Sequence, residues 1–137
     1  MQELQVNKEN CFSVLMAVYK KEQPLFFKEA LRSVFEQSLI PNEVVLVKDG
    51  PLTEELEQII VDFSSKNEQL KVITLEKNQG LGEALRIGLN ACSFDLVARM
   101  DSDDICKPYR FEKQIAFLKE HKEITIVGSW IEEFSDC

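Results

Sequence analysis

Short apolar runs alternate with amphipathic segments along most of this 137-residue chain. The apolar runs are rich in branched side chains and have the length of buried strands, which are apolar on both faces in a parallel sheet. The segments between them repeat apolar residues every three or four positions, which is the period of a helix. We expect strands at Phe12–Val18, Glu43–Lys48 and Lys71–Leu75, in the apolar run that begins at Leu96, and at Ile124–Gly128. Strands that alternate with helices predict an α/β domain with an open, mainly parallel sheet and helices on both faces, as in Rossmann-like folds.

Local signals place the ends of the expected helices. Pro24 suits a first helical turn, and that helix should end near Ser38. Thr53 is a plausible N-cap for the second helix. Pro108 should start the last helix, before Phe111.

The third helix is expected to follow the turn Asn78-Gln79-Gly80. Its leucines Leu81, Leu85 and Leu89 share one face, and we expect this face to be apolar and buried. Ala84 and Gly88 lie beside that face and would let the helix approach the sheet closely.

Composition narrows the class of protein. The length allows one domain with a real core, and no apolar run reaches the roughly 18 residues that span a bilayer. The polar N-terminus lacks the build of a signal peptide, and the four cysteines show no zinc-ligand spacing, which is typical of reduced cytosolic thiols. A net charge of −8 argues against a nucleic-acid partner, because phosphate backbones require clustered Lys and Arg. We therefore expect a cytoplasmic protein.

Three carboxylates follow the fourth apolar run within four residues. Asp101, Asp103 and Asp104 would repel one another unless a cation lies among them. A divalent ion with oxygen ligands, Mg2+ or Mn2+, is the natural partner, and such ions often carry the phosphates of a substrate. A solvated acidic loop, or acids that cap the next helix, is the alternative.

Other polar groups are expected at the same edge of the sheet. Ligands of open parallel sheets bind beyond the carboxyl ends of the strands. Tyr19, Lys20 and Glu22 follow the first strand, Asp49 follows the second, and Asn78 follows the third. Together with the three acids after the fourth strand, they predict a ligand site at this edge.

Several familiar sites are missing from the sequence. It contains no Gly-x-Gly-x-x-Gly after the first strand and no Gly-x-x-x-x-Gly-Lys-Ser/Thr, which argues against a dinucleotide fold and a P-loop. The lone His121 sits late in a helix and cannot complete a Ser-His-Asp set.

Four motifs nevertheless follow one another at a familiar spacing. They are Phe12-Ser-Val-Leu-Met-Ala-Val-Tyr, Val45-Leu-Val-Lys-Asp-Gly, Asn78-Gln-Gly-Leu-Gly-Glu-Ala-Leu and Ala98-Arg-Met-Asp-Ser-Asp-Asp. In this order the chain resembles family 2 glycosyltransferases with the GT-A fold, of the bacterial type that builds exopolysaccharides and O-antigens. Pro108, Arg110 and Phe111 extend the likeness to that subgroup.

The resemblance implies transfer of a sugar from a nucleotide diphosphate donor, usually a UDP-sugar, with inversion and with Mn2+ or Mg2+. Asp101 and Asp103 match the family's Asp-x-Asp motif, which implies contacts with the ribose and with the metal and diphosphate; Ser102 lies between them. Asp104 is either a supporting partner of these acids or close to the acceptor. Asp49 matches the acid that hydrogen-bonds the base, which residues 17–19 (Ala17, Val18 and Tyr19) would line. Two further contacts are implied at Asn78 and Arg86, although Asn78 could instead only hold its turn and Arg86 could simply be exposed.

The same resemblance implies a catalytic carboxylate that deprotonates the acceptor, well after the Asp-x-Asp motif. None of the acids near the C-terminus, such as Glu132, Glu133 and Asp136, has the context of that base. We therefore expect residues 1–137 to be the nucleotide-sugar-binding part of a longer enzyme, with the base beyond Cys137. The implied acceptor is a glycan or a lipid-linked glycan, with peripheral association of the full-length enzyme at the inner face of the membrane.

Three other functions stay open on the sequence. A nucleotidyltransferase that makes sugar nucleotides would need a Gly-rich loop after the first strand, which Tyr19-Lys-Lys-Glu-Gln is not. A receiver-type regulatory domain would collect its acids after the first and third strands. A non-catalytic module that binds nucleotide and metal is the third alternative.

Overall fold

Four strands alternate with four helices along residues 11–128, the part of the chain that this computed structural model describes. The elements are β1 (Phe12–Val18), α1 (Pro24–Phe35), β2 (Glu43–Lys48), α2 (Glu54–Lys66), β3 (Leu70–Thr74), α3 (Leu81–Ala91), β4 (Leu96–Arg99) and α4 (Arg110–Glu120). The expected bounds of β1 and β2 are confirmed, and β3 begins and ends one residue earlier than predicted.

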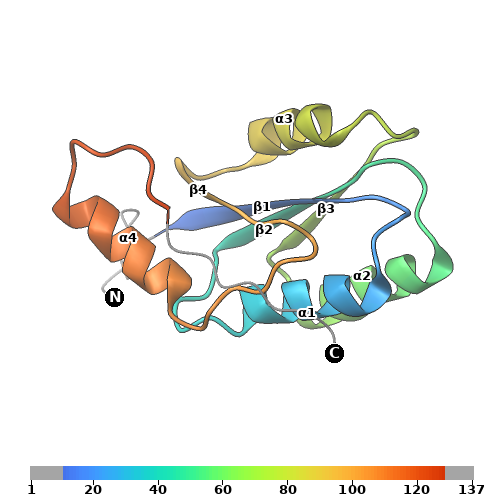
Figure 1. Cartoon of the computed structure of the whole chain (residues 1–137), viewed down its shortest axis with the longest axis horizontal. Helices are drawn as coiled ribbons and strands as arrows, with labels where there is room; N and C mark the ends of the chain where they lie inside the picture. The colour runs from blue at the N-terminus through green and yellow to red at the C-terminus, as the bar shows by residue number, and fades with distance from the viewer. Residues whose placement is uncertain (1–10, 129–137) are drawn as a thin grey trace, which may run out of the picture.

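The strands form one parallel sheet in the order β3-β2-β1-β4. The chain moves outward from β1 to β3 and then returns past β1 to form β4. Because crossovers between parallel strands are right-handed, this reversal puts the connecting helices on opposite faces. Figure 1 shows α3 alone on one face and α1 and α2 on the other, with α4 beside them. The predicted α/β class with helices on both faces is confirmed.

Alternate residues of the central strand β1 supply two cores. Phe12, Val14, Met16 and Val18 face the core shared with α1, α2 and α4, and the ring of Phe12 meets Phe111 of α4 edge to face at 5.1 Å. The intervening residues face α3 in a second core. Both faces of β1 are therefore buried, as its continuous apolar sequence requires.

The packing of α3 confirms the close approach predicted at Ala84 and Gly88, and it differs from the burial expected for the leucine face. Leu81 and Leu89 are each 52% exposed, whereas Ala84 and Gly88 are the buried residues of this helix. A methyl group built at Gly88 would lie only 2.4 Å from the side chain of Leu15. The helix approaches the sheet so closely that only small side chains fit at Ala84 and Gly88. Leu85 therefore packs partly buried against the second core, while Leu81 and Leu89 lie toward solvent.

Residues 124–128, predicted as a fifth strand, form no strand among the described residues. Ile126 is 87% exposed, so the segment is not placed on an apolar surface. Apolar residues indicate that a segment can be buried, but a strand also needs a partner backbone to bond. Within residues 11–128 this segment pairs with neither edge strand of the sheet, β3 or β4.

Two helix ends also differ from the prediction. The first helix ends at Phe35 instead of Ser38, because Gln37 leaves the helix and bonds the carbonyls of Ser33 and Lys107 through its side-chain amide. The last helix begins at Arg110, after a turn that contains Pro108. The predicted N-cap of α2 is confirmed, since Thr53 Oγ1 accepts from the backbone N–H of Leu56.

Cys11, Cys92 and Cys106 form no disulfide within the described residues, and Cys137 lies outside them. The described helices include none whose length and apolarity would let it cross a bilayer.

Candidate functional site

The site is built where β1, β2 and β4 end. The backbone N–H of Asp49 donates to the carbonyl of Val18, so the segments after β1 and β2 start side by side. The N–H of Met100 donates to the carbonyl of Leu15, so the segment after β4 starts beside the middle of β1. β1 lies between β2 and β4, where the strand order reverses. A crevice opens at such a reversal, because neighbouring strands there lead into connections that diverge.

The three residues predicted to line a base lie at the end of β1 and differ in their exposure to solvent. Ala17 and Val18 are buried, with their side chains in the two cores. Tyr19 directly after the strand is 43% exposed. Only Tyr19 therefore presents its side chain to a ligand, while the other two could offer backbone groups.

Asp49 and Asn78 are brought together, as predicted. Asp49 is only 5% exposed, and its Oδ1 accepts a 2.7 Å hydrogen bond from the backbone N–H of Gln79. The Asn78 side chain donates to the Asp49 carbonyl at 3.3 Å and accepts from the N–H of Gly80 at 3.2 Å. The amide of Asn78 is thus used to shape its own turn and to hold the Asp49 backbone.

Gly50 lets these two loops approach each other. Its φ is +90°, and a Cβ there would lie 2.6 Å from the backbone nitrogen of Asn78. Glycine is the one residue without a Cβ, so both the conformation and the close approach depend on it. The position of the Asp49 carboxylate therefore depends on its neighbour Gly50.

The three acids after β4 converge. Each of Asp101, Asp103 and Asp104 offers a carboxylate oxygen, and these atoms lie within 4.8 Å of one another. A turn closed by the Asp104 N–H on the Asp101 carbonyl produces this arrangement, and all three side chains are exposed. Desolvation raises the pKa of Asp104, and the charges of Asp101 and Asp103 raise it further.

This cluster fits a divalent cation by the chemistry of its donors. Carboxylate oxygens are hard ligands, which Mg2+ and Mn2+ prefer. The cation that contacts the cluster within the described residues is Arg99, whose Nη2 lies 3.3 Å from Asp101 Oδ1. One guanidinium at the edge of three acids leaves net negative charge in the loop.

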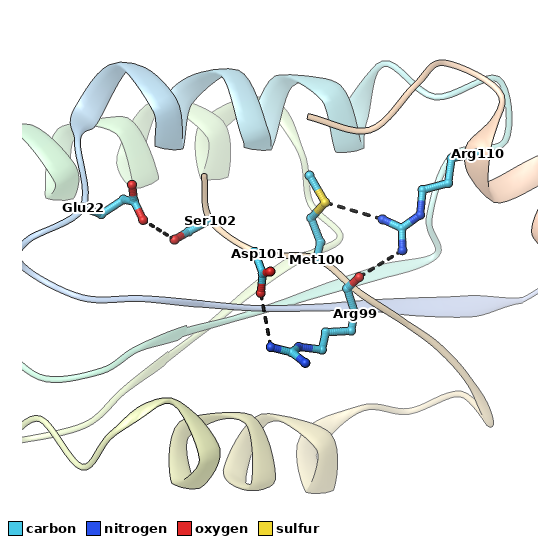
Figure 2. A network of polar contacts seen from close by, with 6 residues as sticks. All are labelled: Glu22, Arg99, Met100, Asp101, Ser102 and Arg110. Carbon is cyan, nitrogen blue, oxygen red and sulfur yellow. Dashed lines mark hydrogen bonds and ion pairs between the residues drawn. The ribbon is translucent and has the colours of Figure 1, made fainter. Parts of the chain in front are cut away.

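Ser102 lies between the acids but is directed elsewhere. Its side chain is buried, and Oγ donates a 2.6 Å hydrogen bond to Glu22 Oε2, which follows β1 (Figure 2). The predicted nucleotide contact at Ser102 stays a prediction, because its hydroxyl is engaged with another loop. Sequence reasoning placed Glu22 at this edge but gave it no role.

Arg110 holds the other side of the acidic loop. Its guanidinium donates to the carbonyl of Arg99 at 3.0 Å and contacts the sulfurs of Met100 and Cys106 at 3.5 and 3.1 Å. Figure 2 shows this side chain reaching from α4 to the last residues of β4. Sequence reasoning noted Arg110 only as part of a motif, since a contact between α4 and the end of β4 is not visible in a linear pattern.

Arg86 is not brought to the other candidates in the described structure. On α3 it forms a two-point ion pair with Glu83, at 2.6 and 2.9 Å, and its side chain is 61% exposed. The guanidinium of Arg86 lowers the pKa of the Glu83 carboxyl through this contact. A role of Arg86 toward a nucleotide stays a prediction.

Comparison with known proteins decides the family. The sequence model of "Glycosyl transferase family 2" matches residues 13–137. The chain belongs to this family. The match favours the glycosyltransferase interpretation over the receiver domain and the nucleotidyltransferase, which the sequence had left open.

Two curated relatives carry functional names. The UDP-Gal:alpha-D-GlcNAc-diphosphoundecaprenol beta-1,3-galactosyltransferase of Escherichia coli is 48% identical over 123 residues, which cover 90% of this chain and 44% of that enzyme. The amylovoran biosynthesis glycosyltransferase AmsE of Erwinia amylovora is 44% identical over 125 residues, covering 91% of this chain and 47% of AmsE. This family 2 chain thus spans less than half the length of both relatives.

A solved structure agrees with the fold. The crystal structure of S. aureus TarS 1–349 in complex with UDP-GlcNAc superposes with a TM-score of 0.71 at 32% identity. The match covers 82% of this chain and 32% of that chain. The family 2 chain therefore has the α/β fold of its GT-A structural neighbours.

Proposed function

We propose that residues 1–137 form the donor-binding part of an enzyme that transfers a sugar from a UDP-sugar. One observation carries the proposal: Asp49 and the acidic loop leave strands on either side of β1, at the carboxyl edge of the sheet. The relatives support a uridine donor, because one is named for UDP-Gal and the TarS structure contains UDP-GlcNAc.

In this proposal the base is bound at the β1–β2 side of the crevice. The Asp49 carboxylate already accepts the Gln79 N–H at one oxygen, and a carboxylate has capacity for further donors. A ring N–H of uracil is such a donor. Tyr19, exposed directly after β1, would contact the face of the base, with the backbone of Ala17 and Val18 beneath it.

The diphosphate is bound at the β4 side. Asp101 and Asp103 would hold Mg2+ or Mn2+ together with the diphosphate and the ribose, and Asp104 would support them. When bound, such an ion neutralises the charge that develops on the departing nucleoside diphosphate. The protein's own part is to fix the carboxylates through the turn that Asp104 closes on Asp101.

Acceptor recognition belongs to other parts of the enzyme in this proposal. Because the chain spans under half of its curated relatives, we propose that the base that deprotonates the acceptor lies beyond Cys137 and that transfer inverts the anomeric carbon. The acceptor is a glycan or a lipid-linked glycan, as the E. coli relative's name mentions diphosphoundecaprenol. The 137-residue chain alone should bind donor and transfer little or no sugar.

Calorimetric titration of UDP into the chain, first with Mn2+ and then with a chelator, tests the donor site. We expect saturable binding that requires Mn2+ and is lost in D103A. Asp95 provides the matched control: it is an exposed acid just before β4, at the opposite end of the same strand. D95N should bind UDP as the wild type does.

Binding of GDP with the affinity of UDP would contradict the uridine assignment. Metal-independent binding of UDP, or equal losses in D103A and D95N, would contradict the role of the acidic loop. Acceptor-dependent turnover by the 137-residue chain would contradict the placement of the base beyond Cys137.

A further inference from the structure

We propose that the hydrogen bond between Glu22 and Ser102 is a positioning tie that couples binding of the nucleoside to binding of the metal ion. The inference rests on the proposed function, because it assigns the base to the segment after β1 and the ion to the segment after β4. In this inference Glu22 and Ser102 act by holding the two segments that carry the ligand-binding groups.

The tie joins two segments that are distant in sequence. Ser102 Oγ donates to Glu22 Oε2 at 2.6 Å, the length of a charge-assisted O–H···O bond. Ser102 is 8% exposed, so water competes little for this contact. Its neighbours on both sides are Asp101 and Asp103, and any shift of Ser102 therefore moves both carboxylates.

Glu22 is itself held by its own loop. Its backbone N–H donates to the carbonyl of Tyr19 at 3.0 Å, which closes the turn after β1. Its second carboxylate oxygen, Oε1, accepts the N–H of Gln23 at 3.1 Å, one residue before α1. The Glu22 side chain is thus fixed to the turn that carries Tyr19, and the turn is fixed to the acidic loop.

This geometry favours Glu22 as a residue that holds the two loops together, and not as a fourth ligand of the metal ion. Glu22 does not belong to the described group of acids whose oxygens converge, and both of its carboxylate oxygens have donors. An ion that orders Asp101 and Asp103 also orders Ser102, which then holds Glu22 and the Tyr19 turn in one position. The nucleoside would find its binding loop already ordered, which is positive coupling between two sites.

Uridine is the probe that isolates this coupling, because it lacks the diphosphate that would contact the metal directly. The dissociation constant of uridine is measured by NMR titration with saturating Mg2+ and with a chelator, and the ratio of the two values is the coupling factor. Typical coupling factors are roughly 5 to 150. We expect a factor in this range for the wild type and a value near one for Glu22→Ala and for Ser102→Ala.

Three comparisons separate positioning from general destabilisation. Glu22→Gln keeps an acceptor for the Ser102 hydroxyl and should restore part of the coupling. The double variant Glu22→Ala/Ser102→Ala should lose no more coupling than either single variant, because both remove the same bond. Ser38→Ala breaks a serine–glutamate bond of 3.0 Å to Glu112, away from the acids, and should keep the wild-type coupling.

The outcomes distinguish this inference from the proposed function. If wild-type chain fails to bind UDP in the presence of Mn2+, the proposed function is wrong, and the tie with it. If UDP binds but the uridine coupling factor is unchanged in Glu22→Ala and Ser102→Ala, only the tie is overturned. Thermal unfolding of every variant is followed in parallel, and Glu22→Gln supplies the test if an alanine variant does not fold.

Discussion

Substitution of Gly50 by alanine should disturb the base side of the site more than the same change at Gly80. Both glycines have left-handed backbone angles, with φ of +90° and +93°, so alanine is strained at either position. A sparsely populated backbone conformation with positive φ costs a residue with a Cβ roughly 1–3 kcal/mol. The two positions differ in their surroundings, and this difference makes Gly80 a matched control.

At Gly50 the added methyl group meets backbone. Its Cβ would lie 2.6 Å from the nitrogen of Asn78 and 3.1 Å from the carbonyl carbon of Lys77, whereas Gly80 has open space within 4 Å. Overpacking of this kind costs about 1–3 kcal/mol. We therefore expect G80A to lose roughly 1–3 kcal/mol of unfolding free energy and G50A to lose about 2–6 kcal/mol.

Urea unfolding followed by circular dichroism measures both losses, and calorimetry measures the affinity for UDP. In G50A the loops separate, the Gln79 N–H leaves the Asp49 carboxylate, and UDP should bind more weakly than to G80A. Equal losses of stability in the two variants would refute the reasoning, because they would mean that the contact with Asn78 carries no cost.

Two further predictions concern the acidic loop. The pKa of Asp104 is raised in the folded chain, so this group favours folding at low pH, and its contribution is lost as the pH rises through the raised pKa. D104N should therefore be more stable than wild type at pH 7 in chelator, by only about a few tenths of a kcal/mol because solvent screens the charges. A D104N variant that unfolds at lower urea concentration than wild type would contradict this. Removal of the Arg110 guanidinium leaves the Arg99 carbonyl without its donor, so R110A should lose about 1–3 kcal/mol of unfolding free energy. R110K should recover only part of the lost unfolding free energy, because an ammonium lacks the planar fork of a guanidinium. The control R32A removes an exposed ion pair with Glu29 and should lose under about 1 kcal/mol of unfolding free energy. Equal losses in R110A and R32A would contradict the role of Arg110.

Features that depend on local sequence and on parallel topology could be predicted. The apolar runs of β1 and β2 were recognisable because both faces of these strands are buried. In a parallel sheet all carboxyl ends lie at one edge, so Asp49 and the acids after β4 could be assigned to one site without knowledge of the strand order. Arg99, which lies in the same motif as the acids, contacts Asp101.

Features that depend on packing between distant segments could not be predicted. The close approach at Ala84 and Gly88 could be predicted, but the exposure of Leu81 and Leu89 that goes with it could not, because the helical period alone favours burial of the leucines. The bond from Ser102 to Glu22 joins loops whose separation a linear pattern does not reveal. The ion pair of Arg86 with Glu83, three residues earlier on the same helix, was likewise not predicted.

The position of β4 has a consequence for the order in which the protein folds. β1, β2 and β3 are consecutive along the chain and can pair as each is synthesised, while β4 pairs with β1 only after α3 has passed over the sheet. Contacts between segments so far apart form slowly, because a long loop must first close. We therefore expect the acidic loop to be the last part of the site to assemble, and a nascent chain that lacks β4 to expose one edge of its central strand to other chains.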